Sequence, residues 1–487
     1  MRILVVIILS LFPLMAGFAQ KQTFEQYKTE QQAKFAKYKS DKQKEFDAYR
    51  RKMNAEYAAY MQNKWTACKT YEAKQKPKDQ DSPMPTFKDE NSSSSVSEIR
   101  YKLIITIVPY ESPNPVVPID EPPIDDEPQF KFTFHGTPCA VHLQEVMKYS
   151  LPDASETSSG DMWLHLSDNI YDALISDCLK LRGDMQLSDW GYINLLQALT
   201  KQFYGSNTNE AVLTQMYILT QSGYDVRIAR YDDKWILLVP FNASLYGYSY
   251  LYLDGKTYYI MDRINKGGRF FAFNRSFPSE KAPSLRMTQS PKLAYSRANT
   301  RTLTSRRFPG MKATVTENHN LIEFYDEYPL SSNWDYYSAA SLANETKETL
   351  YPALKREIVG KSVTQAANML INFVQTAFDY KTDGDQFGYE RPLFGDETIF
   401  YPYSDCEDRS ILYSILVREL LGLDVVLLHY PGHIATAVAF PDNKAYGDYF
   451  RWDNKVYTIC DPTYIGADIG ECMPCYKHTS PEVIQIQ

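Results

Sequence analysis

The residues best suited to chemistry are a cysteine, a histidine and an aspartate near the end of the chain. Cys406 lies in the run Ser-Asp-Cys-Glu-Asp-Arg, His433 ends a Pro-Gly-His turn, and Asp461 opens the run Asp-Pro-Thr-Tyr. A thiolate can attack a carbonyl carbon, an imidazole can move the proton, and a carboxylate can hold the imidazole in one tautomer. These residue types in this order predict a nucleophile, a general base and an orienting group.

The sequence around the cysteine predicts a helix that starts beside it. Ser404 and Glu407 have the spacing of a capping box, an apolar stripe at helical intervals follows, and Gly422 ends the pattern. Cys406 is therefore expected in the first helical turn. Free backbone N–H groups and the helix dipole favour a thiolate there.

The histidine and the aspartate are expected on neighbouring strands. A short apolar run before the Pro-Gly turn reads as a buried strand, and His433 opens the next strand. Asp461 follows a third strand at Lys455–Cys460. His429 is the rival imidazole, but its alternation with its neighbours places it in the middle of its strand.

The motifs at Ser404–Arg409, Pro431–His433 and Cys460–Tyr464 resemble the transglutaminase-like superfamily, which is related to papain-type cysteine proteases. They look most like the secreted transglutaminase-like domains of Bacteroidetes bacteria, and the resemblance covers roughly the last third of the chain. It implies an α+β fold with helices packed on an antiparallel sheet. It also implies Cys406 as nucleophile, His433 as general base and then acid, and the following aspartate as orienting group.

A second copy of the same pattern precedes the first. Asn207–Asp262 aligns without a gap on Cys406–Asp461, at a constant offset of 199 residues. The positions that match the cysteine, histidine and aspartate are Asn207, Lys234 and Asp262. Asparagine supplies no thiolate, and a lysine ammonium is no base at pH 7. We therefore expect a duplication whose first copy is catalytically inactive.

These patterns divide the chain into domains. Residues 130–277 are expected to form the degenerate transglutaminase-like domain, and residues 320–487 the domain with the Cys-His-Asp triad. Residues 278–319 read as a polar linker. Residues 79–129 are rich in Pro, Ser and acidic side chains, which is typical of a linker, with a possible strand at 99–110.

The N-terminal region combines an export signal with a long helix. Residues 1–19 have the charged start, apolar run and small-residue cleavage site of a signal peptide. Residues 20–78 repeat every eleven residues, which predicts a long helix with an aromatic stripe. Between 21 and 78 there are 15 Lys and Arg against 7 Asp and Glu, a net charge of +8. The stripe predicts self-association or docking on a partner, or else packing against the protein's own body.

A long loop leads into the nucleophile. Residues 379–402 are rich in Gly, acidic and aromatic side chains and are expected to wall the substrate cleft. Tyr401 and Tyr403 are then candidates to donate to an oxyanion, together with the backbone N–H of Cys406.

The remaining cysteines leave several pairings open. Cys139 and Cys178 could form a disulfide, Cys460 suits a core position, and Cys472 with Cys475 forms a C-x-x-C. A local disulfide or free thiols are favoured there over a zinc site, since no second C-x-x-C accompanies them. No metal or cofactor motif is recognised.

The sequence therefore predicts an exported, periplasmic or extracellular, cysteine-dependent amide hydrolase or acyl transferase. Its substrate would be a protein, a peptide or a peptidoglycan-type amide, and the exported setting favours hydrolysis over cross-linking. A net charge of −8 argues against a general nucleic-acid binder, and no membrane span is expected. The alternative is a non-catalytic peptide-binding or scaffold protein that uses the same fold.

Overall fold

The computed structural model describes residues 24–486 apart from 64, 78–84, 90–94, 108, 117–128, 169–170 and 263–268. The predicted signal peptide at 1–19 and parts of the predicted linker at 79–129 lie outside the described residues. The chain divides into two compact units, residues 1–55 and residues 56–487. Among the helices that the structure describes, none has both the length and the apolar character needed to cross a membrane.

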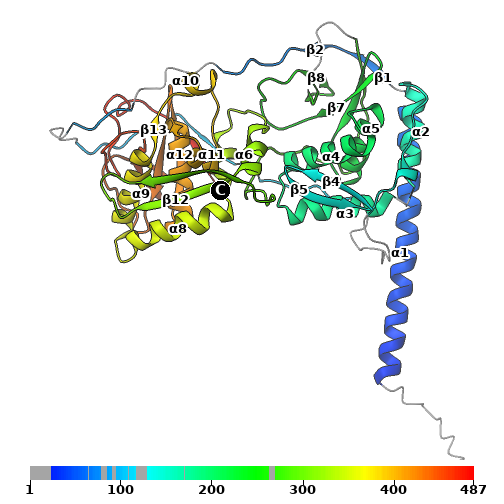
Figure 1. The fold of residues 1–487 in the computed structure, drawn as a ribbon, viewed down its shortest axis with the longest axis horizontal. Coiled ribbons are helices and arrows are strands. Elements are labelled where there is room, and N and C mark those ends of the chain that lie inside the picture. The colour runs from blue at the N-terminus through cyan, green and yellow to red at the C-terminus, as the bar shows by residue number, and fades with distance from the viewer. Residues whose placement is uncertain are drawn as a thin grey trace, which may run out of the picture. The chain divides into compact units, whose positions relative to one another are not determined.

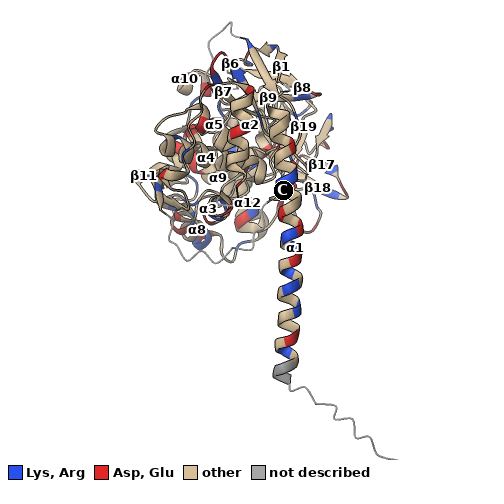
Figure 2. Cartoon of the chain, turned by 90° about the vertical axis from the view of Figure 1, so that its right-hand side faces the viewer, with Lys and Arg blue, Asp and Glu red and all other residues tan. Residues whose placement is uncertain are grey.

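Helix α1 (Phe24–Met61) carries the eleven-residue repeat and is the long N-terminal helix expected from the sequence (Figure 1). Lys and Arg are interspersed with Asp and Glu along it (Figure 2). Within the first unit, aromatic side chains of the repeat are exposed: Tyr27, Phe35, Tyr38 and Tyr49. Tyr57 belongs to the second unit and is buried there, with ring centroids 4.6 Å from Trp163 and 5.0 Å from Phe273.

The predicted helix over 20–78 is wrong beyond Met61. Strands β1 (Trp65–Cys68) and β2 (Thr70–Tyr71) follow it instead. They pair antiparallel with β10 (Phe270–Phe273) and β8 (Tyr250–Leu253), respectively. Trp, Thr and Tyr favour strands, and the two edges of the first sheet offer backbone groups that need partners. The eleven-residue step therefore continues in sequence after the helix has ended.

Residues 130–277 combine helices with an antiparallel sheet, as expected. The sheet has the order β1-β10-β6-β7-β9-β8-β2. Its central strands and the preceding elements are β4 (Phe130–Phe134), β5 (Thr137–Val141), α2 (Glu156–Leu166), α3 (Asp172–Asp184), α4 (Asp189–Tyr204), α5 (Asn209–Gln221), β6 (Arg227–Tyr231), β7 (Lys234–Val239) and β9 (Lys256–Ile260).

The region 278–319, predicted as a linker, contains a hairpin. Strands β11 (Arg297–Thr304) and β12 (Lys312–Asn318) pair antiparallel. Leu303 and Val315 are buried, and α8 (Asn344–Ile358) lies against β12. The polar composition that suggested a linker reflects the exposed face of this hairpin.

The C-terminal region also combines helices with a sheet. Its sheet has the order β17-β18-β16-β15-β19-β3. The elements are α6 (His319–Asp326), α7 (Trp334–Ala339), α9 (Val363–Ala377), β13 (Asp379–Tyr380), α10 (Asp383–Phe387), α11 (Gly395–Phe400), β14 (Tyr403–Ser404), α12 (Cys406–Leu421), β15 (Asp424–Tyr430), β16 (His433–Ala439), β17 (Tyr449–Trp452), β18 (Lys455–Cys460) and β19 (Glu482–Gln485).

Part of the predicted N-terminal linker is built into this second sheet. Strand β3 (Leu103–Ile105), shorter than the strand predicted at 99–110, pairs parallel with β19. Ile99 is buried in the same core, and Phe87 bridges Ile465. Apolar residues of this segment therefore pack and pair with a sheet whose other strands are distant in the sequence.

The two sheets share one order of strands. The series β10-β6-β7-β9-β8 corresponds to β19-β15-β16-β18-β17. The offset of 199 residues carries β7, β8 and β9 onto strands that start at the same relative positions. The same offset carries an ion pair between Lys256 and Asp225 onto one between Lys455 and Asp424. The correspondence found in the sequence thus extends to strand pairing and to side-chain contacts.

Candidate active site

Helix α12 places Cys406 at its first residue. The residue before the helix is Asp405 rather than the predicted cap Ser404, whose hydroxyl accepts from Arg409 Nε at 3.1 Å. The backbone N–H of Leu393 donates to Asp408 Oδ1 at 2.9 Å, which ties the preceding loop to the first turn. Cys406 therefore sits at a helix N-terminus, the position that stabilises a thiolate.

Antiparallel pairing brings the other two residues together. His433 opens β16 and Asp461 directly follows β18, and these two strands are neighbours. His433 Nε2 lies 2.8 Å from Asp461 Oδ2, with both side chains almost fully buried. Asp461 Oδ1 accepts from the backbone N–H of Thr463 at 2.9 Å. The aspartate is thus fixed, and His433 Nδ1 is buried without a hydrogen-bond partner among the described atoms.

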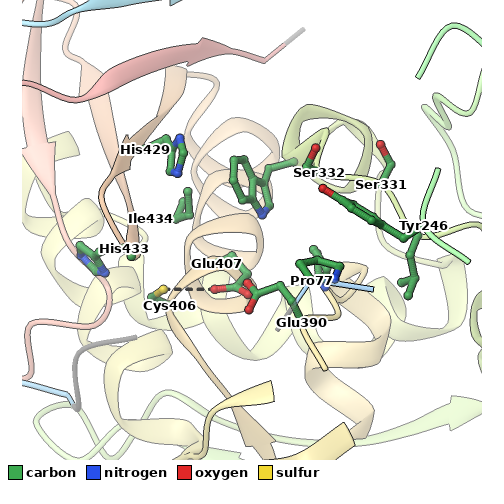
Figure 3. A pocket seen from close by; sticks show the side chains of 14 residues that line it. Pro77, Tyr246, Ser331, Ser332, Glu390, Cys406, Glu407, His429, His433 and Ile434 are labelled. Carbon is green, nitrogen blue, oxygen red and sulfur yellow. Dashed lines mark hydrogen bonds between the residues drawn. The ribbon is translucent and has the colours of Figure 1, made fainter. Parts of the chain in front are cut away.

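The environment of His433 favours the imidazolium. Burial lowers its pKa, but the charge and hydrogen bond of Asp461, together with the thiol of Cys406, outweigh burial and raise the pKa to about 10. Figure 3 shows His433 beside Cys406. An imidazolium that is stable at neutral pH is the partner that a thiolate requires.

Buried carboxylates surround the nucleophile and oppose that charge separation. The thiol of Cys406 donates to Glu407 Oε2 at 3.1 Å (Figure 3). Burial and neighbouring charges raise the pKa of Asp405 and Glu407 well above their usual range, and burial raises that of Asp408 to about 7. In the structure the proton of the thiol therefore points to a carboxylate, and transfer to His433 requires Cys406 to turn away from it.

Cys406 and His433 line a cavity of about 80 Å³. Its walls come from three parts of the chain. Pro77 follows β2, Tyr246 lies between β7 and β8, and Trp334 begins α7. The backbone N–H of Tyr246 donates to Leu330 O at 3.1 Å, so the regions 130–277 and 320–487 meet at the cavity.

The predicted oxyanion donors lie elsewhere. Neither Tyr401 nor Tyr403 is among the described residues that line this cavity. The hydroxyl of Tyr401 contacts Asp326 Oδ1 at 3.1 Å and Arg391 Nη1 at 3.4 Å, and Tyr403 is 37% exposed. The loop that carries them leads to the cysteine but turns these side chains outward.

Tyr476 is a site residue that sequence reasoning missed. Its ring stacks on the imidazole of His433, with centroids 4.9 Å apart and planes 13° apart. Its hydroxyl donates to Pro431 O at 3.4 Å. It follows the C-x-x-C at the end of the chain, and no local pattern points from there to His433.

The matching position within residues 130–277 is also a cavity. Asn207, Lys234 and Asp262 all line a cavity of about 790 Å³. Asn207 Nδ2 lies 3.2 Å from both carboxylate oxygens of Asp262. Lys234 opens β7 as His433 opens β16. These three residues therefore line one cavity, but Asp262 is bonded to Asn207, whereas Asp461 is bonded to His433.

The seven cysteines are all free thiols, so no disulfide joins Cys139 to Cys178 or Cys472 to Cys475. Cys460 is fully buried, in agreement with the predicted core position. Cys475 is the exposed thiol, whereas Cys406 is 2% exposed.

No protein-family model matches this chain, and no curated protein or solved structure shows significant similarity to it. Its chemistry is therefore argued from the residues and the geometry described above.

Proposed function

We propose that this chain is an exported cysteine-dependent amide hydrolase or acyl transferase with two tandem transglutaminase-like domains, of which the second is catalytic. The observation that carries the proposal is the meeting of Cys406, at a helix N-terminus, with the buried His433–Asp461 pair in one cavity. These residues come from three separate elements, and each has the chemical type that its place requires.

The reaction begins with transfer of the thiol proton to His433 Nδ1. The thiolate of Cys406 attacks the amide carbonyl carbon, a C–S bond forms, and the carbonyl π electrons move to oxygen. Backbone N–H groups at the start of α12 are the donors nearest to that oxyanion. His433 then protonates the leaving amine, the C–N bond breaks, and a thioester remains.

The second half returns the enzyme to its starting state. His433 accepts a proton from water or from an acceptor amine, whose oxygen or nitrogen attacks the thioester carbon. The C–S bond breaks and the thiolate is restored. Asp461 stays ionised throughout and holds the imidazole by its Nε2–H. We favour hydrolysis of peptide or peptidoglycan-type amides over cross-linking.

The shared strand order of the two sheets supports a duplicated domain. In the first copy, Asn207 and Lys234 replace the nucleophile and the base, so that copy is expected to bind rather than to react. Its loop at Tyr246 contributes to the cavity of the second copy.

The exposed aromatic residues of α1 support self-association, with a second copy of the chain as partner. Replacing Phe35 and Tyr38 with Ala tests this by sedimentation of the full chain at several concentrations. A mutant as oligomeric as the wild type, or a wild type that stays monomeric, would exclude this face as the interface.

A non-catalytic peptide-binding protein is the second candidate. The observation that favours it is the hydrogen bond of Cys406 to Glu407, which directs the thiol proton to a carboxylate instead of to His433. In that case the triad geometry would be retained for binding alone.

A mixture of peptidyl acyloxymethyl ketones tests the choice, because such probes alkylate an activated thiolate. We expect the adduct on Cys406, its loss in Cys406→Ala, and its slowing in His433→Ala. Cys460→Ala, which removes another buried thiol of the same domain, is the matched control. If Cys406 is labelled as fast in His433→Ala as in the wild type, a non-catalytic binding function is favoured.

A further inference from the structure

Carboxylate side chains form part of the wall of the cavity that contains Cys406. Glu390 and Glu407 line it, and Figure 3 shows them side by side. One oxygen from each lies within 4.8 Å of the other and of an oxygen of the buried Asp383. No lysine or arginine occurs among the described residues that line this cavity. Burial and mutual repulsion raise the pKa of Glu407 and of Asp383 well above their usual range, and a positively charged ligand would offset both effects.

Glu407 leaves one oxygen unsatisfied. The side chain is 2% exposed, and Oε2 accepts from the thiol of Cys406. Oε1 is buried and has no hydrogen-bond partner among the described atoms. A buried acceptor without a donor costs about 1–3 kcal/mol. An oxygen of this kind, on the wall of a cavity, indicates a ligand that brings its own donor.

The spacing of the three carboxylates fits an ammonium group. An ammonium has three N–H donors in a tetrahedral arrangement. With charge-assisted bonds of about 2.8 Å, its three acceptors stand about 4.6 Å apart. The oxygens of Asp383, Glu390 and Glu407 satisfy that limit. One ammonium could therefore bond to all three.

We propose that Asp383, Glu390 and Glu407 bind a primary ammonium group of the acyl donor and thereby select the substrate. This inference rests on the proposed function of Cys406. The thiol lies 3.1 Å from Glu407 Oε2, so the ammonium sits close to the carbonyl under attack. The α-amino nitrogen of a residue is about 2.5 Å from its own carbonyl carbon. The free amine of an N-terminal residue is thus the favoured source, and a side-chain amine is the other.

A second orphan atom distinguishes a peptide-like ligand from a metal ion. Trp334 lines the same cavity, and its indole N–H is buried without a partner among the described atoms. A bare cation offers it no acceptor, whereas a peptide-type substrate supplies a carbonyl oxygen along with the ammonium. The donor and the acceptors of the cavity are therefore satisfied together by one amino-acyl group.

Matched covalent probes test the proposal on the full chain. We would compare acyloxymethyl ketones of alanine with a free amine and with an acetylated amine, and of acetylated lysine and acetylated norleucine. The rate of adduct formation on Cys406 is read by mass spectrometry. We expect the free-amine alanine probe to react at least tenfold faster than its acetylated form. In Glu390→Gln and Glu407→Gln this ratio should fall towards one.

The ratio of two probes cancels any change in the nucleophile itself, which matters because Glu407 contacts Cys406. Glu482→Gln is the control, since its carboxylate contacts His429 on the cavity wall but lies outside the group. A preference for lysine over norleucine alone would assign the ammonium to a side chain. Equal rates for all probes, with Cys406 still labelled, would overturn the proposal and leave the proposed function standing. Loss of the preference on adding CaCl2, with calcium binding seen by calorimetry, would overturn it in favour of a metal site.

Discussion

Replacing Asp461 with Asn removes the charge that stabilises the imidazolium while keeping the shape of the side chain. Asp461 Oδ2 lies 2.8 Å from His433 Nε2, and both side chains are buried. Burial alone lowers the pKa of His433, whereas Asp461 and Cys406 together raise it to about 10. With the carboxylate gone, the pKa should fall towards or below the usual value of about 6.5.

The magnitude follows from the lost pair. A rise from about 6.5 to about 10 corresponds to a net stabilisation of the imidazolium of about 5 kcal/mol, most of which we assign to the carboxylate. Breaking a buried ion pair costs about 3–5 kcal/mol. A loss of about 3 kcal/mol in the thiolate–imidazolium state corresponds to a rate of Cys406 alkylation about 100-fold lower.

The assay is the second-order rate constant for iodoacetamide at pH 6.5, measured at Cys406 by peptide mass spectrometry. Asp262→Asn is the matched control, because it makes the same substitution at the corresponding position of the first domain. The control should react like the wild type. If the Asp461→Asn protein folds normally and its Cys406 is alkylated at the wild-type rate, then Asp461 does not stabilise the thiolate–imidazolium pair.

Three further predictions concern the ring that stacks on the histidine, the pH dependence of stability and a close backbone approach. Tyr476→Leu should slow Cys406 alkylation about tenfold by freeing the imidazole, whereas Tyr476→Phe keeps the stacked ring and should be nearly neutral; equal effects would show that stacking is irrelevant. Because the pKa of His433 is higher in the folded state, its stabilisation is complete below pH about 6.5 and is lost as the pH rises through about 10. The urea-unfolding free energies of wild type and His433→Gln should therefore converge between pH 7 and 10, and a constant difference would contradict the pair. Gly470→Ala should cost more than about 2 kcal/mol, since a Cβ there would lie 1.7 Å from Tyr446 O at a φ of +82°; a wild-type melting temperature would be inconsistent with this packing.

Local sequence was enough to predict the elements around the candidate site. Cys406 begins a helix, His433 begins a strand, and Asp461 follows one, because capping, apolar periodicity and turn residues act over a few positions. The constant offset to Asn207–Asp262 also anticipated the shared order of the two sheets, since strands of the same pattern and connection lengths pair alike.

Contacts between segments that are distant in the sequence could not be predicted from local patterns. The end of the eleven-residue repeat pairs with the first sheet, and β3 pairs with the second. These pairings join segments that are far apart in the sequence, so local patterns do not indicate them. The hydroxyl of Tyr401 accepts a hydrogen bond from Arg391 instead of lining the cavity, a contact that its position in the sequence does not encode. Tyr476 reaches His433 by stacking across the fold, where no periodicity could indicate it.

The most direct test of the central claim is a competition among the seven thiols of the unmodified chain. A limiting amount of iodoacetamide at pH 6 is allowed to react, and each cysteine is then quantified by peptide mapping. Access alone favours the exposed Cys475 over Cys406, which is 2% exposed. An ordinary thiol, with a pKa of about 8.5, is almost wholly protonated at this pH. If His433 and Asp461 activate the thiol, Cys406 is labelled first; labelling of Cys475 ahead of an unreactive Cys406 would contradict a catalytic triad.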